Sequence, residues 1–366
     1  MKNIFPLLFI SLSLVACNND DDTDDTLVYP SEYNSASFDQ NALNELTANL
    51  ALGSLSDAMS KADGGNVVSE TDLKSAWNLQ PLKDKAPAAY TEMLDAEFQA
   101  MALASNNTFE PLDVPNGTGG HYGSRLLDHT GLELEQLIEK GYYNAGMLNE
   151  AVSILNQTNL STADVDRVVA LFGAYPAFSN SDNATEYADR YMAKYAARRT
   201  PSSGGFYLNV KQGCIQLKTA LETEGDWSTE INEAKEMILH NWEMAAAATA
   251  VDYIEGGVEY LSKANLTEDD VAEGMHDLSE GIGFLWGLYL APHQQRIATN
   301  AELATVLNTI YFDVNTSESR LYESWQSANN TLSMLDGVDQ LAAIYGFTNQ
   351  DLSNFRINWV SSEGRE

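Results

Sequence analysis

The sequence is poor in cysteine and in basic residues. Its 366 residues include only two cysteines, Cys17 and Cys214, which excludes a disulfide-rich scaffold. Lysine and arginine together number 20 against 53 aspartate and glutamate residues, so the formal net charge is −33 at neutral pH. This charge disfavours binding to nucleic acid and to anionic lipid headgroups, because both are repelled by an acidic surface.

Motifs of several enzyme chemistries are also missing. The sequence has no glycine-rich dinucleotide or phosphate loop, no H-E-x-x-H zinc motif, no cysteine cluster and no G-x-S-x-G nucleophile turn. Strand-like alternation of apolar and polar residues is nearly absent as well. We therefore expect a helical protein whose chemistry, if any, depends on side chains brought together by the fold.

The N-terminus has the layout of a secretory signal. Lys2 precedes an apolar run from Ile4 to Leu14, which is well short of the roughly 20 residues that a membrane-spanning helix needs. Ala16 and Cys17 then form a lipobox, as in bacterial lipoproteins. This resemblance implies that residues 1–16 are removed, that Cys17 is lipidated, and that the protein is tethered to a membrane through acyl chains.

Five aspartates follow Cys17 closely, so residues 17–37 are expected to form an acidic tether. Acidic residues just after the lipidated cysteine resemble the surface-export signal of Bacteroidetes lipoproteins. The resemblance implies display on the outer face of the outer membrane. The alternative is an ordinary solvated linker on a lipoprotein that faces the periplasm.

Helical periodicity dominates the rest of the chain and predicts an all-α fold, with two packed four-helix-type bundles. The helical domain is expected at residues 38–355, with halves at 38–160 and 184–345, and a C-terminal tail at 356–366. Loops are predicted at 106–130 and 200–205. The predicted helices are 38–62, 70–78, 86–105, 131–156, 163–174, 186–198, 206–222, 229–263, 268–290, 301–310 and 317–345.

The predicted helix from Thr229 is apolar on nearly all sides after Ala245, which places it in the centre of the bundle. His240 and Glu243 lie on this helix. Polar side chains at such depth must find partners or change their protonation state, so both are candidate ligand-binding residues. The alternative is that they are hydrogen-bonded structural residues.

A second candidate face lies on the next helix, where His276, Glu280, Gly283 and Gly287 follow one helical line. A histidine and a carboxylate at this spacing can share a metal ion, so His276 and Glu280 are candidate metal ligands. The two glycines are costly in a helix, which indicates that something approaches closely there. We expect a lined cavity, and a neighbouring helix is the alternative.

A third candidate lies in the segment Gly131 to Gly141, where Glu133 and Lys140 border an apolar stripe. Two such groups can bracket a polar pocket or pair with neighbouring helices. For all three candidate sites the alternative is a buried polar network with a structural role, because such networks also bring ionisable side chains together.

Short motifs carry a resemblance to a known family. The lipobox, the segment Gly131 to Gly141, the segments around Trp242 and Tyr253, and Leu278 to Phe284 together resemble a family of Bacteroidetes lipoproteins known as domain of unknown function 4856. Members carry a histidine-rich helix where this chain has Val165 to Tyr175 without histidine. Any metal ligands that this helix supplies in the family are therefore missing here.

A more distant similarity is to the imelysin group of helical-bundle lipoproteins, which carry a G-x-H-x-x-E motif. This chain has Gly274, His276 and Glu280, with one more residue between the histidine and the glutamate. Both spacings keep the pair on one helix face. The resemblance implies an imelysin-like arrangement of the helical bundles, and a role in iron acquisition or, alternatively, peptidase activity.

These observations favour a non-enzymatic function. We expect a lipid-anchored binding or accessory lipoprotein of the outer membrane that handles a metal ion or metal complex. A divalent or ferric ion is the candidate cofactor, a small ligand is the alternative, and no protein partner is indicated. The other readings are an imelysin-like metallopeptidase and a structural or interaction lipoprotein. Peptidase activity is the least favoured, because a catalytic zinc needs three protein ligands and only two residues have the helical spacing.

Substitution of Cys17 tests the anchor. Cys17→Ala is expected to leave the precursor uncleaved or to release the protein from membranes, because the substituted residue has no thiol to receive a lipid. Membrane fractionation with detection of the protein in each fraction measures this, and full membrane retention of a processed variant would contradict lipidation at Cys17.

Replacement of the aspartates after Cys17 tests surface display. Changing Asp20, Asp21, Asp22, Asp24 and Asp25 to Asn is expected to convert a protease-accessible protein on intact cells into a protected one. Equal protease accessibility of the two proteins would leave the acidic run as a linker.

Overall fold

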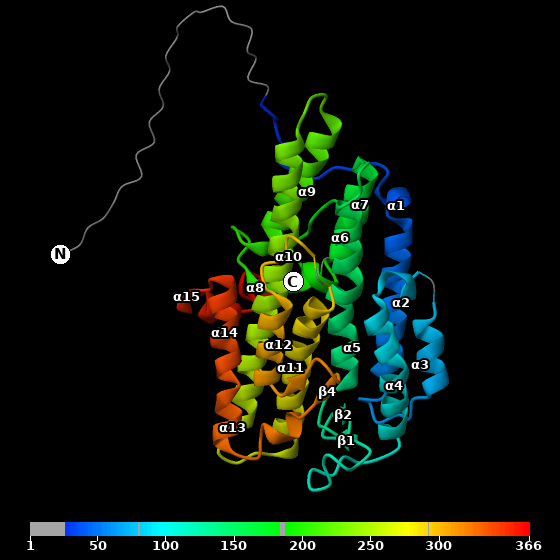
Figure 1. Ribbon diagram of the computed structural model, residues 1–366, viewed down its shortest axis with the longest axis vertical. Helices are drawn as coiled ribbons and strands as arrows, with labels where there is room; N and C mark the ends of the chain where they lie inside the picture. The colour runs from blue at the N-terminus through cyan, green and yellow to red at the C-terminus, as the bar shows by residue number, and fades with distance from the viewer. Residues whose placement is uncertain (1–25, 80, 184–186, 292) are drawn as a thin grey trace, which may run out of the picture.

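The computed structural model describes residues 26–79, 81–183, 187–291 and 293–366, and within them the chain is mostly helical (Figure 1). The predicted all-α fold is confirmed. The predicted signal sequence, Cys17 and the five aspartates lie outside the described residues. Among the described helices, none is both long enough and apolar enough to cross a membrane.

The structure has long helices and short connecting elements. The helices of the N-terminal part are α1 (Phe38–Asn41), α2 (Leu43–Met59), α3 (Glu70–Trp77), α4 (Ala88–Ala104), α5 (Leu134–Tyr142), α6 (Asn149–Leu155) and α7 (Thr162–Phe172). The later helices are α8 (Tyr191–Arg199), α9 (Phe206–Glu222), α10 (Ser228–Leu261), α11 (Glu268–Tyr289), α12 (Asn300–Thr309), α13 (Ala328–Ser333), α14 (Leu335–Tyr345), α15 (Asn349–Phe355) and α16 (Trp359–Ser362). The short elements are η1 (Lys83–Lys85), η2 (Tyr143–Leu148), η3 (Leu321–Glu323), β1 (Gly120–Tyr122), β2 (Arg125–Leu127), β3 (Phe312–Asp313) and β4 (Glu318–Ser319).

Helices α10 and α11 form the centre of the bundle. Helix α10 packs against α8, α9 and α11, and α11 packs against α5 and α12. Figure 1 shows α2, α3 and α4 beyond α5 on one side, and α13 and α14 on the opposite side. Burial follows the predicted pattern: Trp242 of α10 is fully buried and lies 5.1 Å from the ring of Phe172. Thr267 caps α11 in a capping box with Asp270, as its position before an acidic first turn indicates.

One apolar core extends from Tyr33 to Val360. Residues 38–160 and 184–345, expected as possible halves, therefore share this core. Cys214 is buried in it as expected. Residues 356–366, expected as a tail, include α16, and Arg365 near the C-terminus donates hydrogen bonds to the carbonyls of Ala197 and Thr200.

The largest differences from the predicted elements lie in three segments. The predicted helix 131–156 changes to π geometry at η2 and then continues as α6. The predicted helix 317–345 is instead β4, η3, α13 and α14, because Ser317 adopts a positive φ of 57° and Ser327 caps a new helix. The loop predicted at 106–130 contains the antiparallel hairpin β1–β2.

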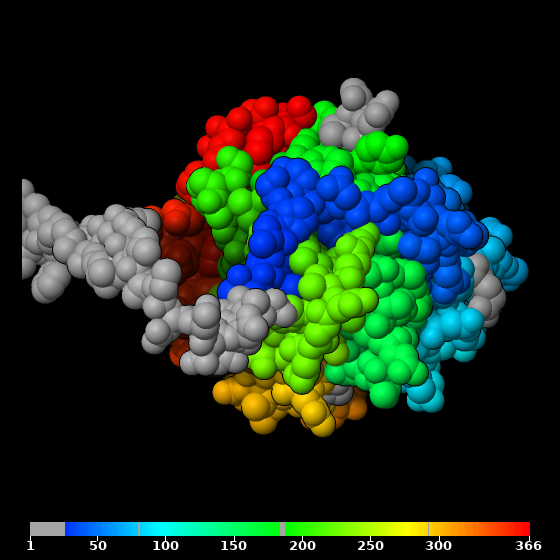
Figure 2. Space-filling model, turned by 90° about the horizontal axis from the view of Figure 1, so that it is seen from above, coloured from blue at the N-terminus to red at the C-terminus, as the bar shows by residue number. Residues whose placement is uncertain are grey.

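Residues 26–37 form a strap across the end of the bundle. Figure 2 shows this segment and α1 (blue) crossing the helices of the middle of the chain (green). The strap is held by one buried acid: Asp166 of α7 accepts hydrogen bonds from the Tyr33 hydroxyl at 2.6 Å and the Ser35 hydroxyl at 2.7 Å. Lys218 of α9 also donates to the carbonyl of Asn34.

Helices α5 and α11 approach each other at two glycines. A Cβ atom on Gly283 would lie 2.7 Å from the carbonyl oxygen of Gln136, and one on Gly287 would meet the carbonyl oxygen of Gly141 even more closely. The expectation of a cavity lined by these glycines is therefore wrong, because the backbone of α5 occupies the space. The alternative of a neighbouring helix is correct.

A pair of glycine substitutions tests this contact. Gly283→Ala is expected to lower the free energy of unfolding by about 1–3 kcal/mol, because the added methyl group forces two packed backbones apart. Gly53→Ala on α2 is the matched control, since nothing lies within 4 Å of its Cβ position. This control should be neutral or stabilising by up to about 1 kcal/mol. Urea unfolding of both variants measures the difference, and equal effects would contradict the close packing.

Candidate functional site

Two of the three predicted sites meet at the contact between α5 and α11. The Nδ1 atom of His276 on α11 lies 2.8 Å from Oε2 of Glu133, at the N-terminus of α5. One turn further along α11, Oε1 of Glu280 lies 3.2 Å from the ammonium of Lys140 on α5. Candidate residues that are more than 130 positions apart in sequence thus form one buried group, here called the α5–α11 cluster: Glu133, Lys140, His276 and Glu280.

The third predicted site, His240 and Glu243, lies elsewhere on α10. The Glu243 carboxylate accepts hydrogen bonds from the backbone amides of Ile297 and Ala298, both at 2.9 Å, and from the Tyr345 hydroxyl at 3.0 Å. His240 contacts the carbonyl of Gln295 at 2.6 Å. These contacts tie α10 to the segment before α12 and to α14. The pair fits the structural alternative, since both carboxylate oxygens of Glu243 are already used.

Glu133 belongs to a second, acidic group that we call the carboxylate triad: Asp63, Glu133 and Glu135. One oxygen from each lies within 4.8 Å of the others, as is required of groups that hold a single metal ion. Asp63 follows α2, Glu133 is the N-cap residue of α5, and Glu135 lies in its first turn. Glu133 is fully buried, and Glu135 is 7% exposed.

Burial and crowding of carboxyl groups raise the pKa values of two members of the triad. Burial, a hydrogen bond with Asp63 and the charges of Asp63 and Glu133 raise the pKa of Glu135 to about 10. Burial and the Glu133 charge raise the pKa of Asp63 to about 6, in spite of hydrogen bonds from Glu135 and the Leu126 amide. Oε2 of Glu135 is buried and has no hydrogen-bond partner among the described residues. A cation among these oxygens would replace the shared proton and give that atom a partner.

Arg125 and two hydrogen-bonding side chains surround Glu133 on its other side. Arg125 of β2 lies 3.8 Å from Oε1 of Glu133 and forms a two-bond ion pair with Glu273 of α11. Gln136 donates to Oε1 of Glu133 at 3.3 Å, and the amide of Glu133 donates to the Ser279 hydroxyl. Both the backbone and the side chain of Glu133 are therefore fixed in position by neighbours.

His276 interacts mainly with Glu133. Burial lowers the pKa of His276, but the hydrogen bond and charge of Glu133, together with the charge of Glu280, outweigh this and raise it. The second ring nitrogen, Nε2, lies 4.0 Å from Oε1 of Glu280. That oxygen also faces the Lys140 ammonium, which is buried and lies beside Glu139. The predicted ligand pair of His276 and Glu280 is thus brought together, but with a lysine against its carboxylate.

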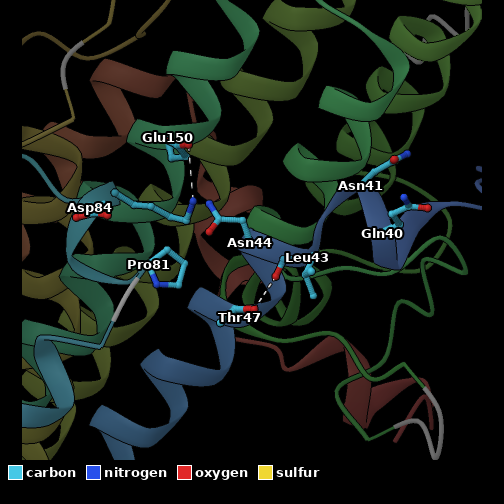
Figure 3. A pocket seen from close by; sticks show the side chains of 9 residues that line it. Gln40, Asn41, Leu43, Asn44, Thr47, Pro81, Asp84 and Glu150 are labelled. Atoms are coloured by element: carbon cyan, nitrogen blue, oxygen red, sulfur yellow. Dashed lines mark hydrogen bonds and ion pairs between the residues drawn. The ribbon is translucent and has the colours of Figure 1, made fainter.

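A large polar cavity lies apart from these groups, between α1, α2 and the segment before α4 (Figure 3). It measures about 670 Å³ and is lined mostly by amide and charged side chains, with the exposed Leu43 at its edge. Its lysine, Lys85, is paired with Glu45 at 3.2 Å and with Glu150 at 3.7 Å. Figure 3 shows the second of these ion pairs on the wall of the cavity. The charged groups of this cavity hold each other in place.

Sequence reasoning missed Asp63, Glu135 and Arg125. Glu135 lies within the segment Gly131 to Gly141 that contains Glu133, but it was not distinguished from the other acidic residues there. Asp63 precedes Gly64 and Gly65, a pattern that indicates a turn and gives no sign of a ligand. Arg125 lies on a strand in a region predicted as a loop.

No family model, curated protein or solved structure matches this chain.

Proposed function

We propose that the protein is a lipid-anchored binding lipoprotein of the outer membrane that holds a metal ion in the carboxylate triad. The observation that carries this proposal is the convergence of Asp63, Glu133 and Glu135, with one oxygen of each within 4.8 Å of the others. Three carboxyl groups at this spacing, two of them buried, are unfavourable unless a proton or a cation joins them.

The donor atoms indicate the class of ion. An all-oxygen set suits hard cations such as Ca²⁺, Mg²⁺ or Mn²⁺ better than ions that prefer sulfur or imidazole. Ferric iron is also a hard cation and fits the same oxygens. His276 contributes by fixing the orientation of Glu133 at 2.8 Å, as residues behind a metal ligand commonly do.

Burial supports binding over catalysis. Glu133 is fully buried and Glu135 nearly so, which leaves a peptide substrate little access to an ion held between them. The imelysin-like metallopeptidase reading places the ion on His276 and Glu280 instead. There the Lys140 ammonium, 3.2 Å from Glu280, competes with a cation for the same oxygen.

The predicted anchor agrees with the position of the strap. The described chain begins at Thr26, at the end of the bundle where the strap crosses α7 and α9 (Figures 1 and 2). A lipidated Cys17 in front of it would hold that end toward a membrane. Surface display on the outer membrane, membership of the family known as domain of unknown function 4856 and the more distant imelysin likeness belong to the same proposal, with a periplasm-facing lipoprotein as the alternative location.

Metal content and titration test the proposal. The purified full-length protein is expected to contain, or to take up, one equivalent of Ca²⁺, Mn²⁺ or Fe³⁺, measured by elemental analysis and isothermal titration. Glu135→Gln and Asp63→Asn should abolish uptake, because each removes a ligand. His276→Ala should weaken affinity by about 10–100-fold, since it removes a support of Glu133 and no ligand.

Two further variants separate the alternatives. Glu97→Gln is the matched control: burial and the Asp128 charge raise the pKa of this carboxyl to about 8, so it is neutral at pH 7 and the amide is a close replacement. It should leave uptake unchanged. Glu280→Gln should do the same, whereas loss of the metal in this variant would assign the site to His276 and Glu280. No metal in the wild-type protein would leave a structural or interaction lipoprotein.

A further inference from the structure

A second polar cavity, of about 390 Å³, lies between α2, the α5–η2 junction and the start of α8. Cavities of roughly 300–1,000 Å³ are typical of small-molecule sites. Three tyrosines, Tyr143, Tyr191 and Tyr195, and three cationic residues contribute to its lining. The cationic residues are Lys140, Arg190 and Lys194.

Most acidic groups at this cavity are already paired. Glu139 is paired with Lys140, and Asp182 accepts a hydrogen bond from Arg198 at 2.7 Å. Asp189 accepts hydrogen bonds from the Tyr207 hydroxyl at 2.8 Å and from the amide of Ser181. Asp57 on α2 is the remaining acid in the lining, and it is exposed.

Two of the cations are not neutralised by the described residues. No ion pair joins Lys194 or Arg190 to a carboxylate of residues 26–79, 81–183, 187–291 or 293–366. Burial and the charges of Arg198 and Lys140 lower the pKa of Lys194. The charges of Asp182 and Glu139 raise this pKa, but by less, so the net shift is downward. In a protein with a net charge of −33, Lys194 and Arg190 are thus two cations without a carboxylate partner among the described residues, in a cavity that four acids also line.

The three tyrosines are mostly buried and contribute ring atoms to the cavity lining beside these charges. The ring of Tyr143 lies 5.5 Å from that of Tyr191 and 6.1 Å from that of Tyr195. The Tyr191 hydroxyl donates to the carbonyl of Asn49 and ties the start of α8 to α2. Tyr143 is the first residue of the π segment η2, and such segments are frequent at functional sites.

We propose that this cavity binds a small organic anion whose carboxylate or phosphate group contacts Lys194 and Arg190 while its uncharged part lies against the rings of Tyr143 and Tyr195. The site is separate from the carboxylate triad, and none of its proposed anion contacts is a member of that triad. A charged group bound by an ammonium and a guanidinium at once gains stronger hydrogen bonds than a neutral ligand does.

Three compounds with the same ring test the proposal. Glucuronate carries a carboxylate, glucose 6-phosphate a phosphate, and glucose neither. Isothermal titration of the full-length protein is expected to show binding of at least one of the two anions. Glucose should bind at least about tenfold more weakly than that anion, because it lacks the charged group that would form the stronger hydrogen bonds. The anion that binds with the higher affinity shows whether the site prefers a carboxylate or a phosphate.

Single substitutions locate the binding. Lys194→Gln and Arg190→Gln should each weaken binding of the anion by about tenfold or more, and Lys194→Arg should retain most of it. Lys235→Gln on α10 is the matched control, since this lysine is also partly buried but lies outside the cavity lining. Glu135→Gln is a second control: it should leave anion binding unchanged and abolish metal uptake, so the two proposals fail separately.

Three outcomes would overturn this inference: no binding of either anion at millimolar concentration, equal affinity for glucose and the anions, or full affinity in both the Lys194→Gln and the Arg190→Gln variants. Circular dichroism of each variant confirms that the helical fold is retained before the affinities are compared.

Discussion

The close approach of α5 and α11 determines the positions of the polar groups in the protein's interior. Gly283 and Gly287 allow the two backbones to touch, and at that separation Glu133 reaches His276 while Lys140 reaches Glu280. Longer side chains in place of the glycines would push the helices apart and break both pairs. The two glycines face the backbone carbonyls of Gln136 and Gly141. The contact therefore also fixes the rotation of α5 about its own axis, and with it the direction of the Glu135 side chain.

Burial of acids is the second theme of the structure. Asp166, Glu243 and Glu133 are all nearly or fully buried, but their surroundings differ. Asp166 and Glu243 are surrounded by hydroxyl and amide donors, which stabilise a carboxylate and leave it with a purely structural role. Glu133 instead lies beside two other carboxyl groups. This difference in neighbours, more than burial itself, separates a structural acid from a candidate ligand.

Much of the fold could be predicted from helical periodicity alone. The predicted helix 206–222 coincides with α9, and the predicted 229–263 differs from α10 by one residue at the start and two at the end. The spacing of His276 and Glu280 correctly placed them on one face. Their partners could not be predicted, because spacing along one helix gives no information about which helix lies opposite. Asp63 shows the limit most clearly: it reaches the triad through the turn after α2, and its local sequence indicates only that turn. The π geometry at Tyr143 and the break at Ser317 depend on tertiary packing, so hydrophobic periodicity could not predict them either.

The strap has a mechanical consequence. Residues 26–37 cross the end of the bundle and are fastened to Asp166 of α7 and Lys218 of α9 before the chain enters α1. Tension applied to the chain ahead of Thr26 would reach these side-chain fastenings first and load them in shear, along the direction in which the strap lies. The single turn of α1 would be shielded from this load. A domain pulled through the chain ahead of Thr26 would thus receive the load directly in α7 and α9.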